Sequence, residues 1–128
     1  MIFSEDIEKL TLENEDYRRV LFTSKYSQLV LMSIPVGEDI HMEIHPDTDQ
    51  FFRFEQGEGE IISGDRIYSV KDGTGVIVPY NTYHRVVNVG DVPLKLYSIY
   101  SPPHHPQGLV EKTKPKNKEK FLYLLSLF

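Results

Sequence analysis

The sequence predicts an all-β protein in which antiparallel strands form a sandwich or barrel. Short runs of branched and aromatic residues recur along the chain, and glycine, proline, asparagine and aspartate separate them. No segment before residue 110 shows a convincing helical period. These two observations favour a jelly roll, because a closed sheet of this kind leaves few strand edges exposed.

The chain begins with an acidic arm at residues 4–16, in which we expect at most one short strand. A Ser-Gly-Asp turn at residues 63–65 predicts a hairpin between the runs on either side of it. The strands are expected at residues 17–24, 28–35, 40–45, 50–54, 60–62, 66–70, 76–79, 82–89 and 93–101.

The 128 residues are expected to form one domain at 1–113, including the N-terminal arm, followed by a basic linker and an apolar tail at 114–128. The tail ends in FLYLLSLF (121–128), and an apolar segment of this kind must be buried somewhere. We expect it to pack on a neighbouring subunit or across its own barrel, and we expect a homodimer.

Composition excludes several classes of function. The formal net charge of −5 argues against nucleic acid as a partner, because nucleic-acid binding requires a basic face. The chain has no cysteine, so neither a disulfide nor a thiolate metal site is expected. The first residues, MIFSEDIEKL, lack the features of a secretory signal. The longest apolar run has eight residues and is too short for a membrane helix. We therefore expect a cytoplasmic protein that does not bind membranes.

Residues 40–45, IHMEIH, alternate strictly between apolar and polar side chains. On a strand this alternation places Ile40, Met42 and Ile44 on one face, and Glu43 and His45 side by side on the other. Pro46 then interrupts the strand, and a hairpin through the following turn residues would bring Gln50 opposite His45. One carboxylate, one imidazole and one amide would then converge, as a divalent first-row metal ion requires. The alternative is a solvated pair of side chains on the surface.

A second motif follows between residues 73 and 88, with Gly73, Pro79, His84 and Asn88 in order. Together with the first motif (Gly37, Glu43, His45, Gln50 and Gly57), this spacing resembles the two motifs of the cupin family. The resemblance covers roughly residues 30–105, and it is strongest to small single-domain cupins described as mannose-6-phosphate isomerase-like. It implies a double-stranded β-helix, the cupin jelly roll.

The resemblance implies that Glu43, His45, Gln50 and His84 hold one divalent transition metal ion (Mn, Fe, Co, Ni or Zn). Three residues depart from the common pattern, because Glu43 replaces a histidine, Gln50 a glutamate and Asn81 a glycine. The amide oxygen of Gln50 is a weak donor, so weaker metal binding is expected than in the common set. The alternative is a degenerate site that has lost its metal.

Several neighbouring residues are candidates for roles in catalysis. His41 shares the expected face of Glu43 and His45, and is interpreted as a polar core histidine. The prolines around His104 and His105 could fold this segment over the barrel mouth, where His105 would serve as an acid or base. Tyr97 is the tyrosine taken as a further catalytic candidate.

Three functions are compatible with these patterns. We favour a metal-dependent, isomerase-like enzyme that acts on a small polar or sugar-type substrate. The sequence near the motifs contains no cluster of lysines or arginines that could bind a phosphate group. An oxygen-dependent cleavage enzyme is a further enzymatic option. The alternatives are a non-catalytic module that binds a small ligand or a metal, and a structural or interaction protein.

Overall fold

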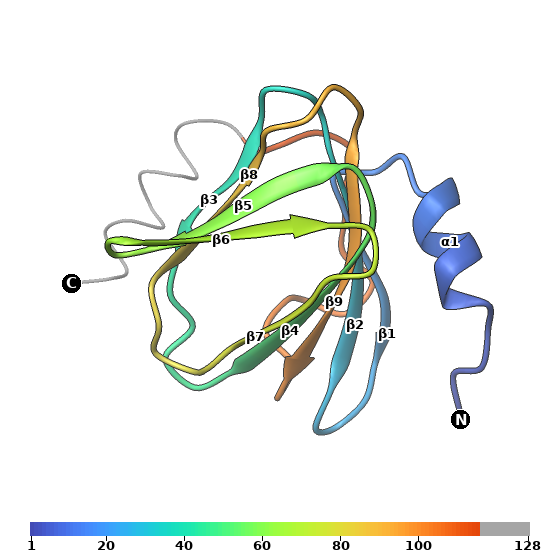
Figure 1. Cartoon of the computed structure of the whole chain (residues 1–128). Coiled ribbons are helices and arrows are strands. Elements are labelled where there is room, and N and C mark those ends of the chain that lie inside the picture. The colour runs from blue at the N-terminus through green and yellow to red at the C-terminus, as the bar shows by residue number, and fades with distance from the viewer. Residues whose placement is uncertain (116–128) are drawn as a thin grey trace.

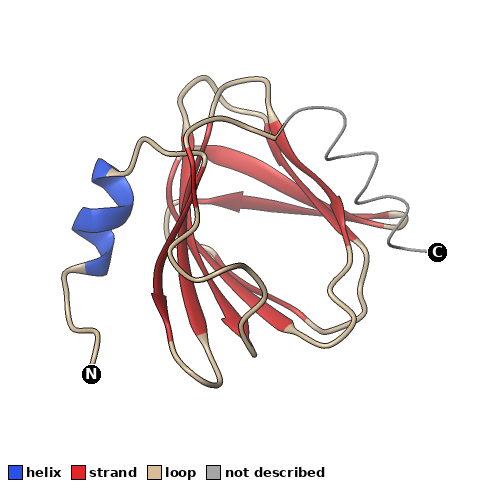
Figure 2. Ribbon diagram, turned by 180° about the vertical axis from the view of Figure 1, so that it is seen from behind, coloured by secondary structure: helices blue, strands red, loops and turns tan. Residues whose placement is uncertain are grey.

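The computed structural model describes residues 1–115, so the apolar tail and most of the predicted basic linker lie outside the described residues. Two antiparallel sheets face each other around a common interior (Figure 1). Seen from behind, α1 lies outside the two layers of strands (Figure 2). In this part of the chain the elements are α1 (Ile7–Glu13), β1 (Arg18–Thr23), β2 (Gln28–Ile34), β3 (Asp39–Glu43), β4 (Asp49–Gln56), β5 (Glu58–Ser63), β6 (Arg66–Lys71), β7 (Gly75–Val78), β8 (His84–Asn88), β9 (Leu94–Ser101) and β10 (Val110–Glu111).

Six strands form the first sheet, in the order β10-β1-β2-β9-β4-β7, and four form the second, in the order β3-β8-β5-β6. The predicted all-β antiparallel fold is therefore confirmed. The predicted hairpin at residues 60–70 is also confirmed, because β5 pairs with β6 from Glu58↔Lys71 to Ser63↔Arg66. Among residues 1–115, no helix is both long and apolar enough to cross a bilayer.

The core lies between the two sheets, and on β4 buried and less buried residues alternate over residues 49–54. On β4, Gln50, Phe52 and Phe54 face the interior. Burying each large apolar side chain contributes about 1.5–3 kcal/mol. The buried apolar cluster comprises Tyr17, Val20, Val30, Met32, Ile34, Ile40, Phe52, Phe54, Ile61, Val70, Val78, Val86, Leu94, Leu96 and Tyr100.

The N-terminal arm forms a helix, so the prediction of a short strand there was wrong. The Asp6 side chain caps α1 by accepting a hydrogen bond from the backbone N–H of Lys9 at 3.1 Å. Thr11, which is fully buried, donates its hydroxyl to the carbonyl of Ile7. Seven residues span only two turns, which is too few for a helical period to appear in the sequence. The helix packs against β9 and β4 on the outside of the first sheet.

The predicted hairpin between residues 40–45 and Gln50 is also wrong. β3 pairs with β8 in the second sheet, whereas β4 pairs with β7 and β9 in the first. The chain between β3 and β4 therefore crosses from one sheet to the other. Gln50 and His45 consequently belong to opposite walls of the interior, which local spacing in the sequence does not show.

A bulge in β3 corrects the predicted alternation of residues 40–45. Ile40 pairs with Val86 and Glu43 pairs with His84, so β3 contains one residue more than β8 over this stretch. The extra residue allows Ile40 and Glu43, three positions apart, both to face the interior. Ile40 is 2% exposed, while Met42 is 37% exposed and points outward. The bulge therefore combines a core residue and a candidate ligand on one face.

Candidate metal centre

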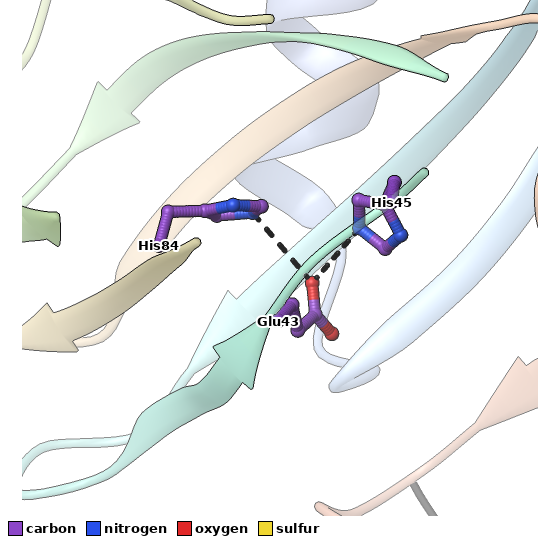
Figure 3. A group of neighbouring side chains, drawn as sticks. All are labelled: Glu43, His45 and His84. Atoms are coloured by element: carbon purple, nitrogen blue, oxygen red, sulfur yellow. Dashed lines mark hydrogen bonds and ion pairs between the residues drawn. The ribbon is translucent and has the colours of Figure 1, made fainter. Parts of the chain in front are cut away.

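Glu43, His45 and His84 form a buried cluster between the two sheets (Figure 3). Glu43 ends β3, His45 follows two residues later, and His84 is the first residue of β8, directly paired with Glu43. Each offers one ligand atom, and the three atoms lie within 4.8 Å of one another. The register between β3 and β8 thus brings together two residues that lie 41 positions apart (84 − 43).

One oxygen of the Glu43 carboxylate lies between the two imidazoles. Its Oε2 atom is 3.2 Å from Nε2 of His45 and 3.8 Å from Nε2 of His84. The dashed lines in Figure 3 mark these two contacts. A carboxylate oxygen and two imidazole nitrogens that converge in this way form a donor set suited to a divalent transition metal ion.

The tautomer of His84 follows from its second nitrogen. Nδ1 lies 3.0 Å from the backbone carbonyl of Thr82. A carbonyl only accepts, so Nδ1 carries the proton and Nε2 presents a lone pair. Within residues 1–115 this buried Nε2 has no hydrogen-bond partner. It instead faces the lone pairs of Glu43, an arrangement that a cation would satisfy.

Electrostatics favour the metal-binding protonation states of Glu43 and His84. Burial opposes ionisation of Glu43, but the hydrogen bond from His45 and the charge of Arg18 outweigh it and hold the Glu43 pKa at about 2. Burial lowers the pKa of His84. Near neutral pH the carboxylate is therefore ionised and the His84 imidazole is neutral, as metal ligation requires.

Arg18, on β1, is a residue of the site that the sequence analysis missed. Its Nη2 atom is 3.7 Å from Oε1 of Glu43, and its Nη1 atom forms an ion pair with Glu111. Arg18 thus engages one oxygen of Glu43 and leaves the other to the imidazoles. The available signal was alternation, because Arg18 lies two residues before the inward-facing Val20 on an expected strand.

Gln50 lies on β4 with its side chain 1% exposed. Its amide Nε2 donates to the hydroxyl of Ser98 at 2.9 Å, and that hydroxyl donates to the carbonyl of Phe51. The amide oxygen is buried and, among the residues that the structure describes, has no hydrogen-bond partner. The amide is therefore oriented with its metal-binding atom available. Its role as a fourth ligand stays a prediction.

The segment that carries His104 and His105 lies against the cluster, on the His45 side. Gln28 holds its backbone, because the Gln28 amide oxygen accepts hydrogen bonds from the N–H groups of His104 and His105 at 3.1 and 2.9 Å. The Gln28 amide nitrogen donates to the carbonyl of His105. The ring centroids of His104 and His45 are 4.2 Å apart. The expected closure of this segment over the interior therefore agrees with the structure.

His105 contacts the cluster through Tyr100, which faces the interior on β9. Nε2 of His105 is 3.2 Å from the Tyr100 hydroxyl, and the Tyr100 ring lies 5.5 Å from that of His45. Burial and the nearby Arg18 charge lower the pKa of His105 to about 3. Burial, with a contribution from His45, lowers that of His104 to about 4. Both imidazoles are therefore neutral near pH 7.

The structure does not bring Tyr97 into the cluster. Tyr97 alternates with the buried Ser98 and Tyr100, so its side chain lies on the outer face of β9. Its ring centroid is 6.4 Å from that of Phe51. Tyr100, three residues later, occupies the interior position instead. His41 lies half-buried in the bulged part of β3, outside the group of three ligand atoms.

Comparisons with known proteins agree with this architecture. Residues 30–100 match the model of the Cupin_2 family, described as a cupin domain. The chain is 47% identical over 118 residues to the uncharacterized protein YrkC of Bacillus subtilis, covering 88% of this chain. It is 39% identical over 120 residues to the uncharacterized protein L612 of Acanthamoeba polyphaga mimivirus, covering 91% of this chain and 75% of that protein.

Among solved structures, BH2720 from Bacillus halodurans is similar, with 46% identity, a TM-score of 0.85, and coverage of 87% of this chain and 89% of that one. TT1209 from Thermus thermophilus is 20% identical with a TM-score of 0.68, covers 77% of this chain and 96% of that one, and shares the fold. The present chain spans 63% of the length of the Bacillus subtilis relative.

Proposed function

Since the chain belongs to the cupin family, we propose that it binds one divalent transition metal ion through Glu43, His45 and His84. The observation that carries this proposal is the environment of His84. Its buried Nε2 lone pair faces a carboxylate oxygen at 3.8 Å, and no donor in residues 1–115 satisfies it. Leaving such a buried polar atom without a partner costs about 1–3 kcal/mol, which a bound cation would recover.

The donor set indicates which ions fit. Two imidazoles and one carboxylate supply a ligand charge of −1, and the free amide oxygen of Gln50 would complete the set without changing it. Mixed nitrogen and oxygen donors of this kind suit Mn(II), Fe(II), Co(II), Ni(II) or Zn(II). When bound, the ion would supply Lewis acidity toward an oxygen atom of a substrate.

We further propose an isomerase-like activity on a small polar substrate. Isomerisation requires groups that accept and return a proton beside the bound substrate. His105 would hold and move a proton at Nε2, with the Tyr100 hydroxyl 3.2 Å away as its partner. The segment that carries His104 and His105 would also limit the access of water to the cluster from its side.

The second candidate is a non-catalytic module that binds a small ligand. The low pKa values of His104 and His105, about 4 and about 3, favour this candidate, because an effective general base has a pKa closer to neutral pH. The outer position of Tyr97 favours it too, since this tyrosine does not reach the interior.

Metal binding is tested by titrating the chelator-treated protein with each of the five ions in a calorimeter. One ion should bind per chain, and His84→Ala should abolish this binding. His41→Ala is the matched control, since it removes a histidine from β3 outside the cluster, and it should bind as the wild type does. Absence of binding by every ion would refute the proposed metal site.

The choice between enzyme and module is tested on the metal-loaded protein in deuterated water. An isomerase should incorporate deuterium into an aldose or ketose substrate, and NMR of the sugar would detect it. A ligand that raises the melting temperature without deuterium incorporation would support the binding module instead. His105→Ala should slow incorporation while leaving the metal content unchanged.

A further inference from the structure

A cavity of about 160 Å³ opens next to His84 between edges of the two sheets. β6 is at the edge of the second sheet and β7 at the edge of the first (Figure 1). In the part of the chain that the structure describes, these two edges do not pair with each other. The hairpin of β5 and β6, strand β7 and the residues before β8 form the walls.

The lining of this cavity changes from its floor to its rim. The floor is buried, since Ile61 and His84 are each 1% exposed and Val78 is 7% exposed. The rim is apolar and exposed, with Tyr68 at 46% and Ile77 at 69%. An apolar entrance therefore leads to a floor that contains a proposed metal ligand.

Two polar side chains in the wall are already engaged with the backbone. The hydroxyl of Ser63 donates to the carbonyl of Tyr83 at 2.7 Å. The hydroxyl of Thr82 donates to the carbonyl of Tyr80 at 3.3 Å. Apart from His84, the wall therefore exposes mainly carbon atoms to a bound ligand. These atoms come from Ile61, Val76, Val78 and Pro79.

We propose that this cavity binds the apolar group of the natural ligand, with the ligand's polar head directed to the metal centre. A volume of about 150 Å³ is enough for a benzene molecule, so the group would be one six-membered ring or a short branched chain. This inference rests on the proposed metal site for the polar head, and it narrows the ligand class. A sugar-type substrate would therefore place an apolar substituent in this cavity and keep its hydroxyls outside it, because hydroxyls would lose their hydrogen bonds against this wall.

The test compares benzoate with acetate on the metal-loaded protein by calorimetry. The two probes share a carboxylate head and differ in the ring. Burying a ring in the cavity should make benzoate bind at least about tenfold tighter than acetate. Val76→Phe should fill the cavity and remove this difference. Val36→Phe, which adds the same side chain at an exposed site 53% accessible to solvent, should retain it.

A metal-independent measurement separates the failure of this inference from the failure of the metal site. Benzyl alcohol should shift the methyl NMR signals of Ile61 and Val78 whether or not metal is present, and Val76→Phe should abolish the shifts. Equal affinities for benzoate and acetate on a metal-loaded protein, or benzyl alcohol shifts that survive Val76→Phe, would overturn the inference. Methyl signals that change with protein concentration, showing that a second copy covers the rim, would also overturn it.

Discussion

Arg18→Met tests whether the charge of Arg18 stabilises the Glu43 carboxylate, because it removes a buried charge and replaces it with an apolar side chain of similar length. Arg18 is 6% exposed and lies 3.7 Å from Glu43, while its other terminal nitrogen pairs with Glu111. With an effective dielectric constant of about 20, the attraction between Arg18 and Glu43 is roughly 4 kcal/mol before desolvation is counted. Removing one partner of such a pair leaves two carboxylates uncompensated.

The variant should therefore lose about 3 kcal/mol of unfolding free energy in the metal-free state, at the lower end of measured costs for a broken buried pair. The metal affinity of the variant should not fall with its stability. A nearby positive charge opposes the binding of a divalent cation, so Arg18→Met should bind metal at least as tightly as the wild type.

Urea denaturation of the chelator-treated protein and calorimetric titration with metal measure the two effects. Arg19→Met is the matched control, because Arg19 is the exposed neighbour on β1, and its change in stability should stay within about 0.5 kcal/mol. Unchanged stability of Arg18→Met would refute the electrostatic argument. A parallel loss of stability and metal affinity would show that Arg18 positions Glu43 for ligation instead.

Three further outcomes are expected. Gly59→Ala should lower the unfolding free energy by about 1–3 kcal/mol, because its new Cβ would lie 2.9 Å from the Val87 carbonyl oxygen. Gly75→Ala is the control and should lower it less, because its Cβ meets nothing closer than 3.4 Å. Equal losses of stability in thermal denaturation would contradict this packing. Glu43→Gln should lower the stability of the metal-free protein by up to about 3 kcal/mol at pH 7, because the Glu43 pKa falls from 4.5 to about 2 on folding. The difference in stability between wild type and variant should narrow as the pH falls from 4.5 towards 2, because the wild-type carboxylate becomes protonated. A difference in urea titrations that does not depend on pH would refute the low pKa of Glu43. His105→Ala should keep the metal and lose about a hundredfold or more in turnover, if His105 carries the proton, and unchanged turnover would exclude that role.

Alternation and turn residues in the sequence predicted most of the strands, because residues two apart on a strand share a face. Phe52 and Phe54 follow Gln50 into the interior, and Val86 follows His84, as this rule requires. The motif spacing likewise identified Glu43, His45 and His84, which the structure brings together. Both kinds of prediction depend only on local spacing or on the family resemblance.

The failures involve features that local spacing does not encode. The bulge in β3 inserts one residue against β8, which moves Met42 outward and keeps both Ile40 and Glu43 inside. The chain after His45 crosses to the other sheet because β4 finds its partners in β7 and β9, far away in the sequence. Pairing over such separations is set by the closure of the whole sheet and not by a neighbouring turn.

The contact between Arg18 and Glu43 is also not encoded by local spacing. Arg18 lies 25 positions before Glu43 (43 − 18) and meets it only because β1 and β3 lie in opposing sheets. Alternation with Val20 places Arg18 on the inward face of β1 and Arg19 on the outward face. An arginine on an expected strand is ordinarily a solvated residue, so this pattern does not reveal the ion pair with Glu43.

The most direct measurement is elemental analysis of the protein purified without a histidine tag, beside a Glu43→Ala, His84→Ala double mutant. We predict close to one equivalent of a first-row divalent metal in the wild type and none in the double mutant, with circular dichroism confirming that both are folded. Metal that is absent from the wild type, even after incubation with each ion, or that persists in the folded double mutant, would contradict the proposed metal centre.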